Sequence, residues 1–122
     1  MAKLSGPAKR LSAYIGEADQ YDGRPLYEAL VEAARTAGCA GATVLRGIEG
    51  FGATSRKFGK HALRMSEDRP VVVEVVDKHD RIAAVAELFA AMMGDGMIAL
   101  SDVEVTYYRG GITGGPKPVA KG

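Results

Sequence analysis

The sequence contains a single cysteine, Cys39, among its 122 residues. One cysteine excludes an internal disulfide and a zinc site built on cysteine thiolates. The residues beside it are small and apolar, which favours a buried, inert thiol over a reactive one. Histidine is almost as scarce, because His61 and His79 are the only two. They lack metal-ligand spacing and an evident nucleophile, so we expect no metal ion and assign no catalytic residue.

Long apolar runs and an excess of charge of one sign are also missing. The apolar runs fall far short of the roughly 20 residues that a membrane-spanning helix needs. The basic residues near the start are not followed by the apolar region of a signal peptide, so we expect a cytoplasmic protein. The 16 basic and 15 acidic residues leave a net charge of +1, and aromatic residues make up only 7%. Neither a strong positive field nor a base-stacking platform is present, so we expect no nucleic-acid partner.

Periodicity divides most of the chain into strands and helices. Apolar residues that alternate with polar ones, or β-branched runs, indicate strands, whereas apolar residues spaced three and four apart indicate amphipathic helices. Asp77 lies where it could cap the second helix. The strands are expected at residues 9–16, 41–48, 70–77 and 97–108, and the helices at residues 26–37 and 78–93.

The order strand, helix, strand, strand, helix, strand predicts the fold class. It is typical of the α+β ferredoxin-like βαββαβ sandwich, a four-stranded antiparallel sheet with two helices on one face. We expect one domain over residues 1–109, because the chain is long enough for one hydrophobic core only. Residues 110–122 hold five glycines and two prolines. We expect them to form a flexible tail, because they carry too few apolar groups to order themselves.

The second face of such a sheet would have no helix to cover it. In this arrangement that face carries apolar side chains, which usually marks an interface. We therefore expect a homo-oligomer, most simply a closed ring. The side chains concerned are Tyr14, Leu45, Val72, Val76 and Tyr108.

The connection between the second and third predicted strands is far longer than a hairpin needs, and loops of that length are usually functional or disordered. Its glycines permit close approach of the backbone to a ligand, and its hydroxyl and cationic side chains suit a phosphate or a carboxylate. A merely structural or solvated loop remains the alternative. The glycines are Gly47, Gly50, Gly52 and Gly59, and the donors are Thr54, Ser55, Arg56, Lys57 and Lys60.

A second glycine motif, Gly94-Asp95-Gly96, follows the second helix. Such a motif is more often a helix stop with a tight turn, but its N–H groups could also form an anion-binding nest. Arg46 and Arg109 could direct positive charge at that site, although each alone is typical of an ordinary surface arginine. An enzyme of ferredoxin-like fold, using His61 with Glu67 or Asp68, is a rival interpretation.

With these elements in place, the chain resembles the PII-like superfamily of trimeric signalling proteins. Gly41-Ala-Thr-Val44 and Glu49-Gly-Phe-Gly52 are similar to the strand and base of the long T-loop, and Gly94-Asp-Gly96-Met-Ile98 is similar to the B-loop. One branch, domain of unknown function 190, is resembled more closely over roughly residues 3–109. The motifs that carry this closer resemblance are Leu4-Ser-Gly6, Tyr14-Ile-Gly-Glu17, Pro25-Leu-Tyr27, Ala40-Gly-Ala-Thr-Val-Leu-Arg-Gly47 and Gly50-Phe-Gly-Ala53.

The resemblance implies a homotrimer with ligand clefts between subunits. The ligand would be a small anionic effector, an adenine nucleotide in PII itself, and not a permanently bound cofactor. The loop at residues 51–69 would dock on a partner such as a membrane channel or transporter, and the protein would be a regulator and not an enzyme. The residues expected to bind the effector are Arg46, Gly50, Gly52, Ala53, Thr54, Ser55, Arg56, Gly94, Asp95, Gly96 and Arg109.

The chain departs from the PII pattern at three places. Met97 stands where PII proteins carry a lysine after the Gly-Asp-Gly turn, and Arg109 alone replaces a pair of arginines. The long loop also lacks the tyrosine that some PII proteins modify. Losing phosphate-pairing cations weakens the case for a triphosphate, and a mono- or diphosphate, a cyclic nucleotide or another anion fits as well. A ligand-free interaction protein that regulates a membrane channel is the remaining alternative.

Overall fold

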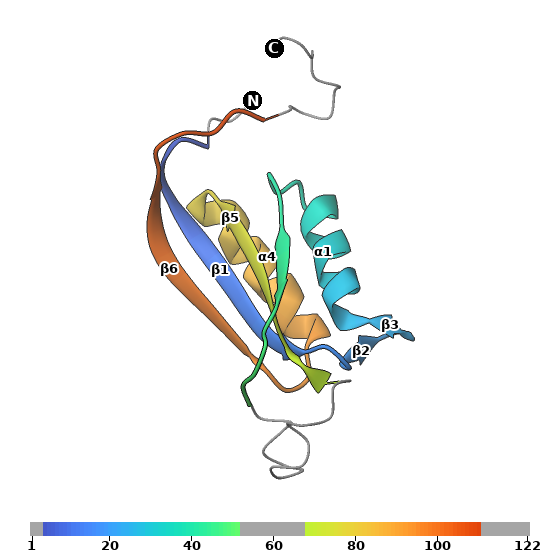
Figure 1. Cartoon of the computed structure of the whole chain (residues 1–122). Coiled ribbons are helices and arrows are strands. Elements are labelled where there is room, and N and C mark those ends of the chain that lie inside the picture. The colour runs from blue at the N-terminus through green and yellow to red at the C-terminus, as the bar shows by residue number, and fades with distance from the viewer. Residues whose placement is uncertain (1–3, 52–67, 111–122) are drawn as a thin grey trace.

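The computed structural model of the chain describes residues 4–51 and 68–110. Within these residues the helices and strands follow one another in the predicted order, with one addition, a small hairpin between the first strand and the first helix (Figure 1). In chain order the elements are β1 (Gly6–Gly16), β2 (Gln20–Tyr21), β3 (Arg24–Pro25), α1 (Leu26–Thr36), β4 (Thr43–Arg46), β5 (Pro70–Asp77), α4 (His79–Met92) and β6 (Met97–Val105).

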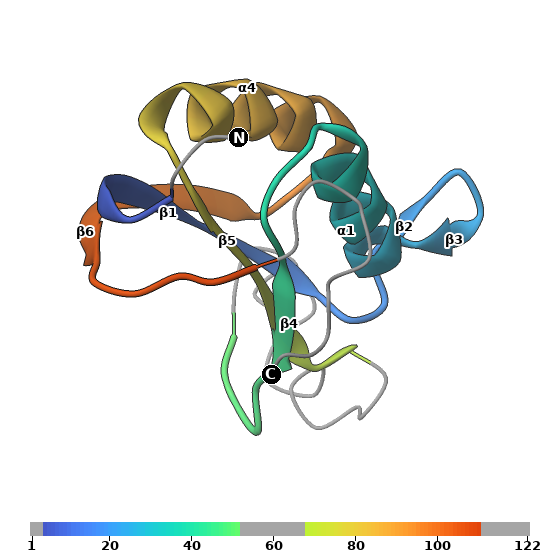
Figure 2. The same ribbon diagram turned by 90° about the horizontal axis from the view of Figure 1, so that it is seen from above.

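The main sheet has the strand order β4-β5-β1-β6, and every pairing in it is antiparallel. Both helices lie on the same face of this sheet, as the view from above shows (Figure 2). The first and third long strands, β1 and β5, therefore occupy the centre, and β4 and β6 form the edges. The predicted ferredoxin-like βαββαβ arrangement is confirmed.

The core lies between the sheet and the two helices, and the alternation in β1 explains why. Leu11, Ala13 and Ile15 point to the helix-covered face and are buried, and their cross-strand partners on β5 are buried too. Full burial of one such aliphatic side chain contributes about 1.5–3 kcal/mol. The buried cluster consists of Leu11, Ala13, Ile15, Leu26, Leu30, Ala34, Val71, Val73, Val75, Ile82, Val85 and Phe89.

The prediction that Asp77 caps the second helix is wrong. Asp77 is the last residue of β5, the N-cap position belongs to Lys78, and no side chain of the described residues caps that end. The Asp77 carboxylate instead accepts one hydrogen bond from the backbone N–H of Lys78 at 2.7 Å and another from that of Ala40 at 2.9 Å. It therefore joins the end of β5 to the loop that precedes β4, a link that no local sequence pattern reports.

The last strand is shorter than predicted. β6 ends at Val105, because its partner β1 begins at Gly6 and Gly6 pairs with Val105. Residues 106–110 pair with no strand in the described part of the chain and leave the sheet. Tyr108, predicted on the uncovered face of the sheet, therefore lies beyond the end of the strand. It is 39% exposed.

The small hairpin of β2 and β3 is absent from the sequence prediction. Its turn residues, Asp22 and Gly23, both have positive φ angles, 53° and 79°. An Asp-Gly pair is a strong signal for this kind of two-residue hairpin turn, which requires positive φ at both positions. The signal is therefore in the sequence, but the flanking strands are only two residues long and show no alternation.

The connection from β1 to this hairpin is fixed by Asp19. Its carboxylate accepts a hydrogen bond from Gly16 N–H at 2.9 Å, and its backbone carbonyl accepts one from Leu26 N–H at 2.8 Å. Burial raises the pKa of the Asp19 carboxyl group. The Gly16 N–H opposes that shift, and the nearby carboxylates of Asp68 and Asp95 add to it.

The face of the sheet opposite the helices keeps apolar side chains exposed. Tyr14 on β1 and Leu45 on β4 are 42% and 50% exposed. Met97 on β6, the cross-strand partner of Tyr14, is 56% exposed. Val72 and Val76 of β5 are half-buried on the same face. We call the surface formed by Tyr14, Leu45, Val72, Val76 and Met97 the open face.

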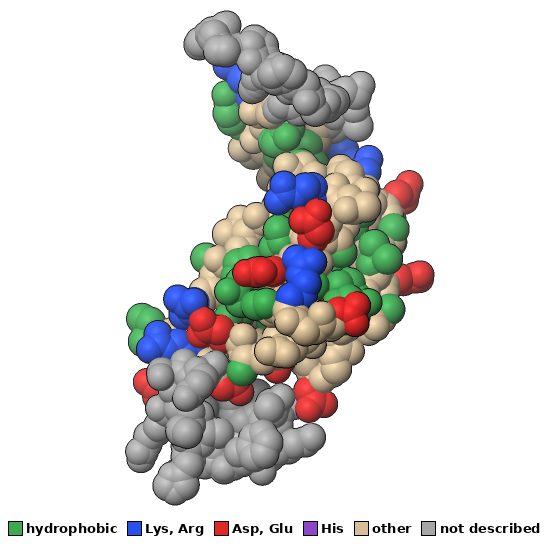
Figure 3. Space-filling model, turned by 90° about the vertical axis from the view of Figure 1, so that its right-hand side faces the viewer, with side chains coloured by type: hydrophobic (Ala, Val, Ile, Leu, Met, Phe, Trp, Pro, Cys, Tyr) green, Lys and Arg blue, Asp and Glu red, His purple; other side chains and the backbone are tan. Residues whose placement is uncertain are grey.

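A lateral side of the molecule, the right-hand side in Figure 1, has a different character. On the side that carries α1, acidic and basic side chains are interspersed, with hydrophobic groups between them (Figure 3). No helix of the described residues is long enough and apolar enough to cross a membrane.

The core predicts a large penalty for truncating Phe89, whose side chain is fully buried. Phe89→Ala should lower the free energy of unfolding by about 3–5 kcal/mol, because it removes buried surface and leaves a cavity. The matched control is Leu88→Ala, since Leu88 is adjacent on α4 but 44% exposed, and it should cost about 1 kcal/mol or less. Urea unfolding at a fixed protein concentration measures both, and equal losses would contradict the core assignment.

The raised pKa of Asp19 predicts a pH-dependent stability. A raised folded-state pKa means that the folded chain binds the proton more tightly than the unfolded chain, so stability falls as pH rises through that pKa. Asp19→Asn should therefore raise the melting temperature at neutral pH, and the gain should vanish at acid pH, where the wild-type carboxyl group is protonated.

Asp102 supplies a control of opposite sign. Lys9 lies 2.6 Å from its carboxylate and lowers the pKa of Asp102. A lowered pKa stabilises the folded chain above the unfolded pKa, and that gain is lost as pH falls, so Asp102→Asn should slightly lower the melting temperature at neutral pH. Thermal melts from acid to neutral pH measure both variants. If both substitutions lowered the melting temperature at neutral pH, the surroundings of Asp19 would not disfavour its charged carboxylate.

Candidate anion-binding site at the loop end of the sheet

Two connections meet at one end of the sheet, the lower end in Figure 1. The antiparallel register causes this, because Gly16 at the end of β1 pairs with Pro70 at the start of β5. On the other side of β1, Tyr14 pairs with Met97 at the start of β6. The long connection of residues 47–69 and the turn Gly94-Asp95-Gly96 therefore both begin or end here. We call this region the loop end.

Arg46 is the predicted site residue that the structure places most firmly. It is the last residue of β4, and its guanidinium Nη2 lies 2.6 Å from the Glu17 carboxylate. The next residue, Gly47, donates its N–H to the carbonyl of Pro70 at 2.6 Å. Glu17 N–H in turn donates to the carbonyl of Arg69 at 2.8 Å. The two ends of the long connection are thus held together at the edge of the sheet.

Two glycines of the long connection have a packing role. A Cβ atom on Gly47 would lie 2.8 Å from the ring of Pro70, and one on Gly50 would lie 3.4 Å from the same ring. The first distance requires the neighbour to move, so Gly47 lets the two ends of the connection approach closely. Part of the glycine content that suggested a ligand site is explained by this contact.

The Gly94-Asp95-Gly96 turn is held against the end of β1. Gly96 has a φ of +143°, and a Cβ there would lie 2.7 Å from the carbonyl oxygen of Tyr14. Only glycine fits that position. Around Gly94, in contrast, the space where a Cβ would stand is open, with no described atom within 4 Å. Within the turn, Gly96 is therefore required by packing against β1, whereas the space beside Gly94 is open to a ligand.

The loop end is rich in carboxylates. Asp68 accepts a hydrogen bond from Ala18 N–H at 3.3 Å, and Asp68 and Asp95 both lie close enough to Asp19 to raise its pKa. Among the residues that the structure describes, no group of three or more His, Cys, Asp or Glu side chains is arranged to hold a metal ion. Arg46 is the predicted site cation that lies at this end in the described residues.

The remaining predicted site residues are not at the loop end or lie outside the described residues. Arg109 follows the end of β6, where Val105 pairs with Gly6 at the start of β1, so it lies beyond the opposite end of the sheet, with its guanidinium 5.5 Å from the ring centre of Tyr107. Gly52, Ala53, Thr54, Ser55 and Arg56 fall in residues 52–67, outside the described part, as do His61 and Glu67 of the rival enzyme hypothesis.

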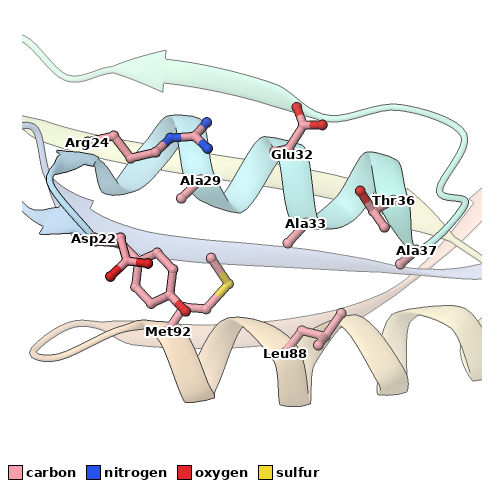
Figure 4. Close-up of a pocket in the computed structure, with 10 residues that line it drawn as sticks. Asp22, Arg24, Ala29, Glu32, Ala33, Thr36, Ala37, Leu88 and Met92 are labelled. Carbon is pink, nitrogen blue, oxygen red and sulfur yellow. The ribbon is translucent and has the colours of Figure 1, made fainter.

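A separate hollow lies between the two helices and is closed at one end by the β2–β3 hairpin (Figure 4). Its volume is about 390 Å³, and none of the described candidate residues lines it. Its walls are alanines of α1 and two larger side chains of α4, with charged groups at the rim. The lining residues are Tyr21, Asp22, Arg24, Ala29, Glu32, Ala33, Thr36, Ala37, Leu88 and Met92.

Cys39 lies in the loop after α1 and is partly buried. Burial raises the pKa of its thiol, the Asp77 carboxylate raises it further, and Arg81 opposes the shift. A raised pKa leaves less reactive thiolate at neutral pH, in line with an inert thiol.

Two curated relatives align with most of the chain. A UPF0166 protein from Aquifex aeolicus (strain VF5) is 38% identical over 100 residues, which cover 81% of this chain and 93% of the relative. A UPF0166 protein from Methanocaldococcus jannaschii is 32% identical over 105 residues, which cover 84% of this chain and 94% of the relative.

Solved structures of PII-like proteins share the fold. CPII from Thiomonas intermedia K12, a nitrogen regulatory PII-like protein solved with ADP, AMP and acetate, superimposes with a TM-score of 0.59 at 18% identity, covering 87% of this chain and 94% of CPII. A protein described as PII-like and signalling, from Thermus thermophilus, gives a TM-score of 0.58 at 14% identity, covering 86% and 94%. At these identities the likeness establishes the fold alone.

The family assignment comes from sequence. Residues 8–105 match the profile of the family DUF190, described as "Uncharacterized ACR, COG1993". That span runs from the third residue of β1 to the end of β6, so it includes nearly the whole sheet and both helices. Together with the two relatives above 30% identity, the match shows that the chain belongs to the DUF190 family, with a PII-like fold.

Proposed function

We propose that the protein is a PII-like regulator that binds a small anionic effector, of the adenine nucleotide class, at the loop end of the sheet. The observation that carries this proposal is the convergence of Arg46, Gly50 and the Gly94-Asp95-Gly96 turn at one end of a PII-like fold. CPII, which has the same fold, has been solved with ADP and AMP.

The effector site in this proposal lies between subunits. The loop end of one chain carries Arg46 and Arg69 among several carboxylates, and the second predicted arginine, Arg109, follows the opposite end of the same sheet, where β6 ends at Val105 beside Gly6. One chain cannot direct both arginines at one ligand. A neighbouring copy can supply the second cation if the subunits pack through the open face, and a closed ring of three copies provides that arrangement.

The charges at the loop end favour an effector of modest charge. Asp19, Asp68 and Asp95 lie close together there, and anions repel a highly charged ligand. Met97 follows the turn and provides no cation. AMP and ADP therefore fit this site better than ATP. The regulator would pass the signal to its partner, a membrane channel or transporter, through residues 51–69, and no chemical step is assigned to it.

Nucleotide binding is the direct test of the proposed function. Isothermal titration should show saturable binding of ADP or AMP, with ATP weaker. Arg46→Ala should weaken ADP binding about 10- to 100-fold, because a hydrogen bond to a charged group contributes about 1.5–3 kcal/mol. The matched control is Arg35→Ala, since Arg35 is an exposed arginine on α1 that also lies near a glutamate, Glu32.

The control should bind ADP like the wild type. The absence of binding heat with AMP, ADP and ATP would rule out the proposed function, and an Arg46→Ala variant with unchanged affinity would move the site away from the loop end.

Assembly through the open face is tested by introducing one charge. Wild-type protein should sediment at about three times the 12.8 kDa chain mass. Leu45→Glu should dissociate the trimer, because it places an unpaired charge in an apolar interface. The matched control is Leu88→Glu, since Leu88 has similar exposure, 44% against 50%, but lies on the helix side. A monomeric wild type, or dissociation by Leu88→Glu alone, would exclude this interface.

A further inference from the structure

Glu17 occupies a position that connects the two ends of the long connection. Its backbone N–H donates a hydrogen bond to the carbonyl of Arg69, at the end of the connection that leads into β5. Its carboxylate accepts a hydrogen bond from the guanidinium of Arg46, at the end of the connection that follows β4. One residue of the β1–α1 connection therefore holds both ends, one through its backbone and the other through its carboxylate.

The backbone of Glu17 is fixed more firmly than its side chain. The following residue, Ala18, donates its N–H to the Asp68 carboxylate, and Asp19 donates its N–H to the carbonyl of Gly16 at 3.1 Å. Within the described part of the chain, the Glu17 carboxylate forms its ion pair with Arg46. A competing partner for Arg46 would thus free the side chain of Glu17 without moving its backbone.

The pair is partly sheltered from water. The Glu17 side chain is 23% exposed and that of Arg46 is 54% exposed, with 2.6 Å between Nη2 and Oε2. A guanidinium presents its N–H groups as a fork that matches either a carboxylate or a phosphate. The Glu17 carboxylate therefore uses the same donors that an anionic effector needs.

Resting on the proposed function, we infer that Glu17 is an internal competitor for the effector at Arg46. In the free protein its carboxylate occupies the guanidinium, and the phosphate of the effector displaces it. Displacement breaks the side-chain contact between Glu17 and the β4 end of the connection, while the backbone hydrogen bonds of Gly47 to Pro70 and of Glu17 to Arg69 remain. Effector binding is thereby coupled to the loss of the side-chain contact at the β4 end, next to the residues that lead into the docking loop.

Competition also sets which anions bind. A ligand must interact with Arg46 more strongly than an already positioned carboxylate does, so a singly charged carboxylate gains little by exchange. A phosphate that carries close to two charges gains more, because its attraction to the guanidinium is larger. Glu17 consequently makes Arg46 selective for phosphate groups over carboxylates.

The test is the isosteric variant Glu17→Gln, which keeps the size of the side chain and removes its charge. ADP binding measured by titration calorimetry should tighten at least about five-fold, the lower end of usual coupling between linked equilibria. Adenosine, which has no phosphate, should bind the variant and the wild type equally. Glu32→Gln is the matched control, since it removes an equivalent charge from another glutamate that faces an arginine, 3.9 Å away on α1.

A double-mutant cycle separates competition at Arg46 from a general change in charge. In the Arg46→Ala background, Glu17→Gln should no longer tighten ADP binding, whereas long-range repulsion would act there too. An unchanged ADP affinity in Glu17→Gln, with Arg46→Ala still impaired, would overturn this inference and leave the proposed function intact. If neither the wild type nor the Glu17→Gln and Arg46→Ala variants bound ADP, both this inference and the proposed function would be overturned. Tightening that persists without Arg46 would assign the effect to repulsion and reject competition.

Discussion

The register of β1 is the constraint on which the rest of the structure depends. This strand pairs with β5 on one side and β6 on the other over most of its length. Because side chains alternate along a strand, a slip by one residue would move Leu11, Ala13 and Ile15 from the core to the open face. The core residues therefore hold the register, and the register in turn decides which chain ends meet. It brings the long connection and the glycine turn together at the loop end.

Local patterns were sufficient to predict the fold because each element is locally consistent, as the alternation in β1 and β5 shows. Where a contact joins residues far apart in sequence, the prediction failed or was silent. The Asp77 carboxylate accepts a hydrogen bond from Ala40, and β6 ends at Val105 because that residue pairs with the first residue of β1. Both features join distant parts of the chain, so local patterns could not predict them. Arg46 and the glycine turn were predictable as separate motifs, but their shared location follows only from strand pairing. The Glu17–Arg46 contact spans 29 positions and depends on the path of the β1–α1 connection, so no spacing rule indicates it.

The one-sided sheet links stability, assembly and ligand binding. Two helices cover one face, and the other exposes Tyr14, Leu45 and Met97, which the proposed assembly with further copies of the chain would bury. If the effector binds between copies, it stabilises the assembled state by mass action, and assembly in turn raises the affinity for the effector. Burial of the open face and recognition of the effector then become parts of one equilibrium.

Electrostatics at the loop end explain how the proposed anion site is compatible with a chain of nearly zero net charge. The net charge is only +1, and three aspartates cluster near the end of β1. A permanently open cationic site there would bind any available anion. The ion pair with Glu17 neutralises the Arg46 guanidinium, and in the proposed mechanism only a ligand with greater charge density displaces it. Selectivity in such a site comes from the difference between two anions at one cation, so it is set by the internal carboxylate as much as by the arginine.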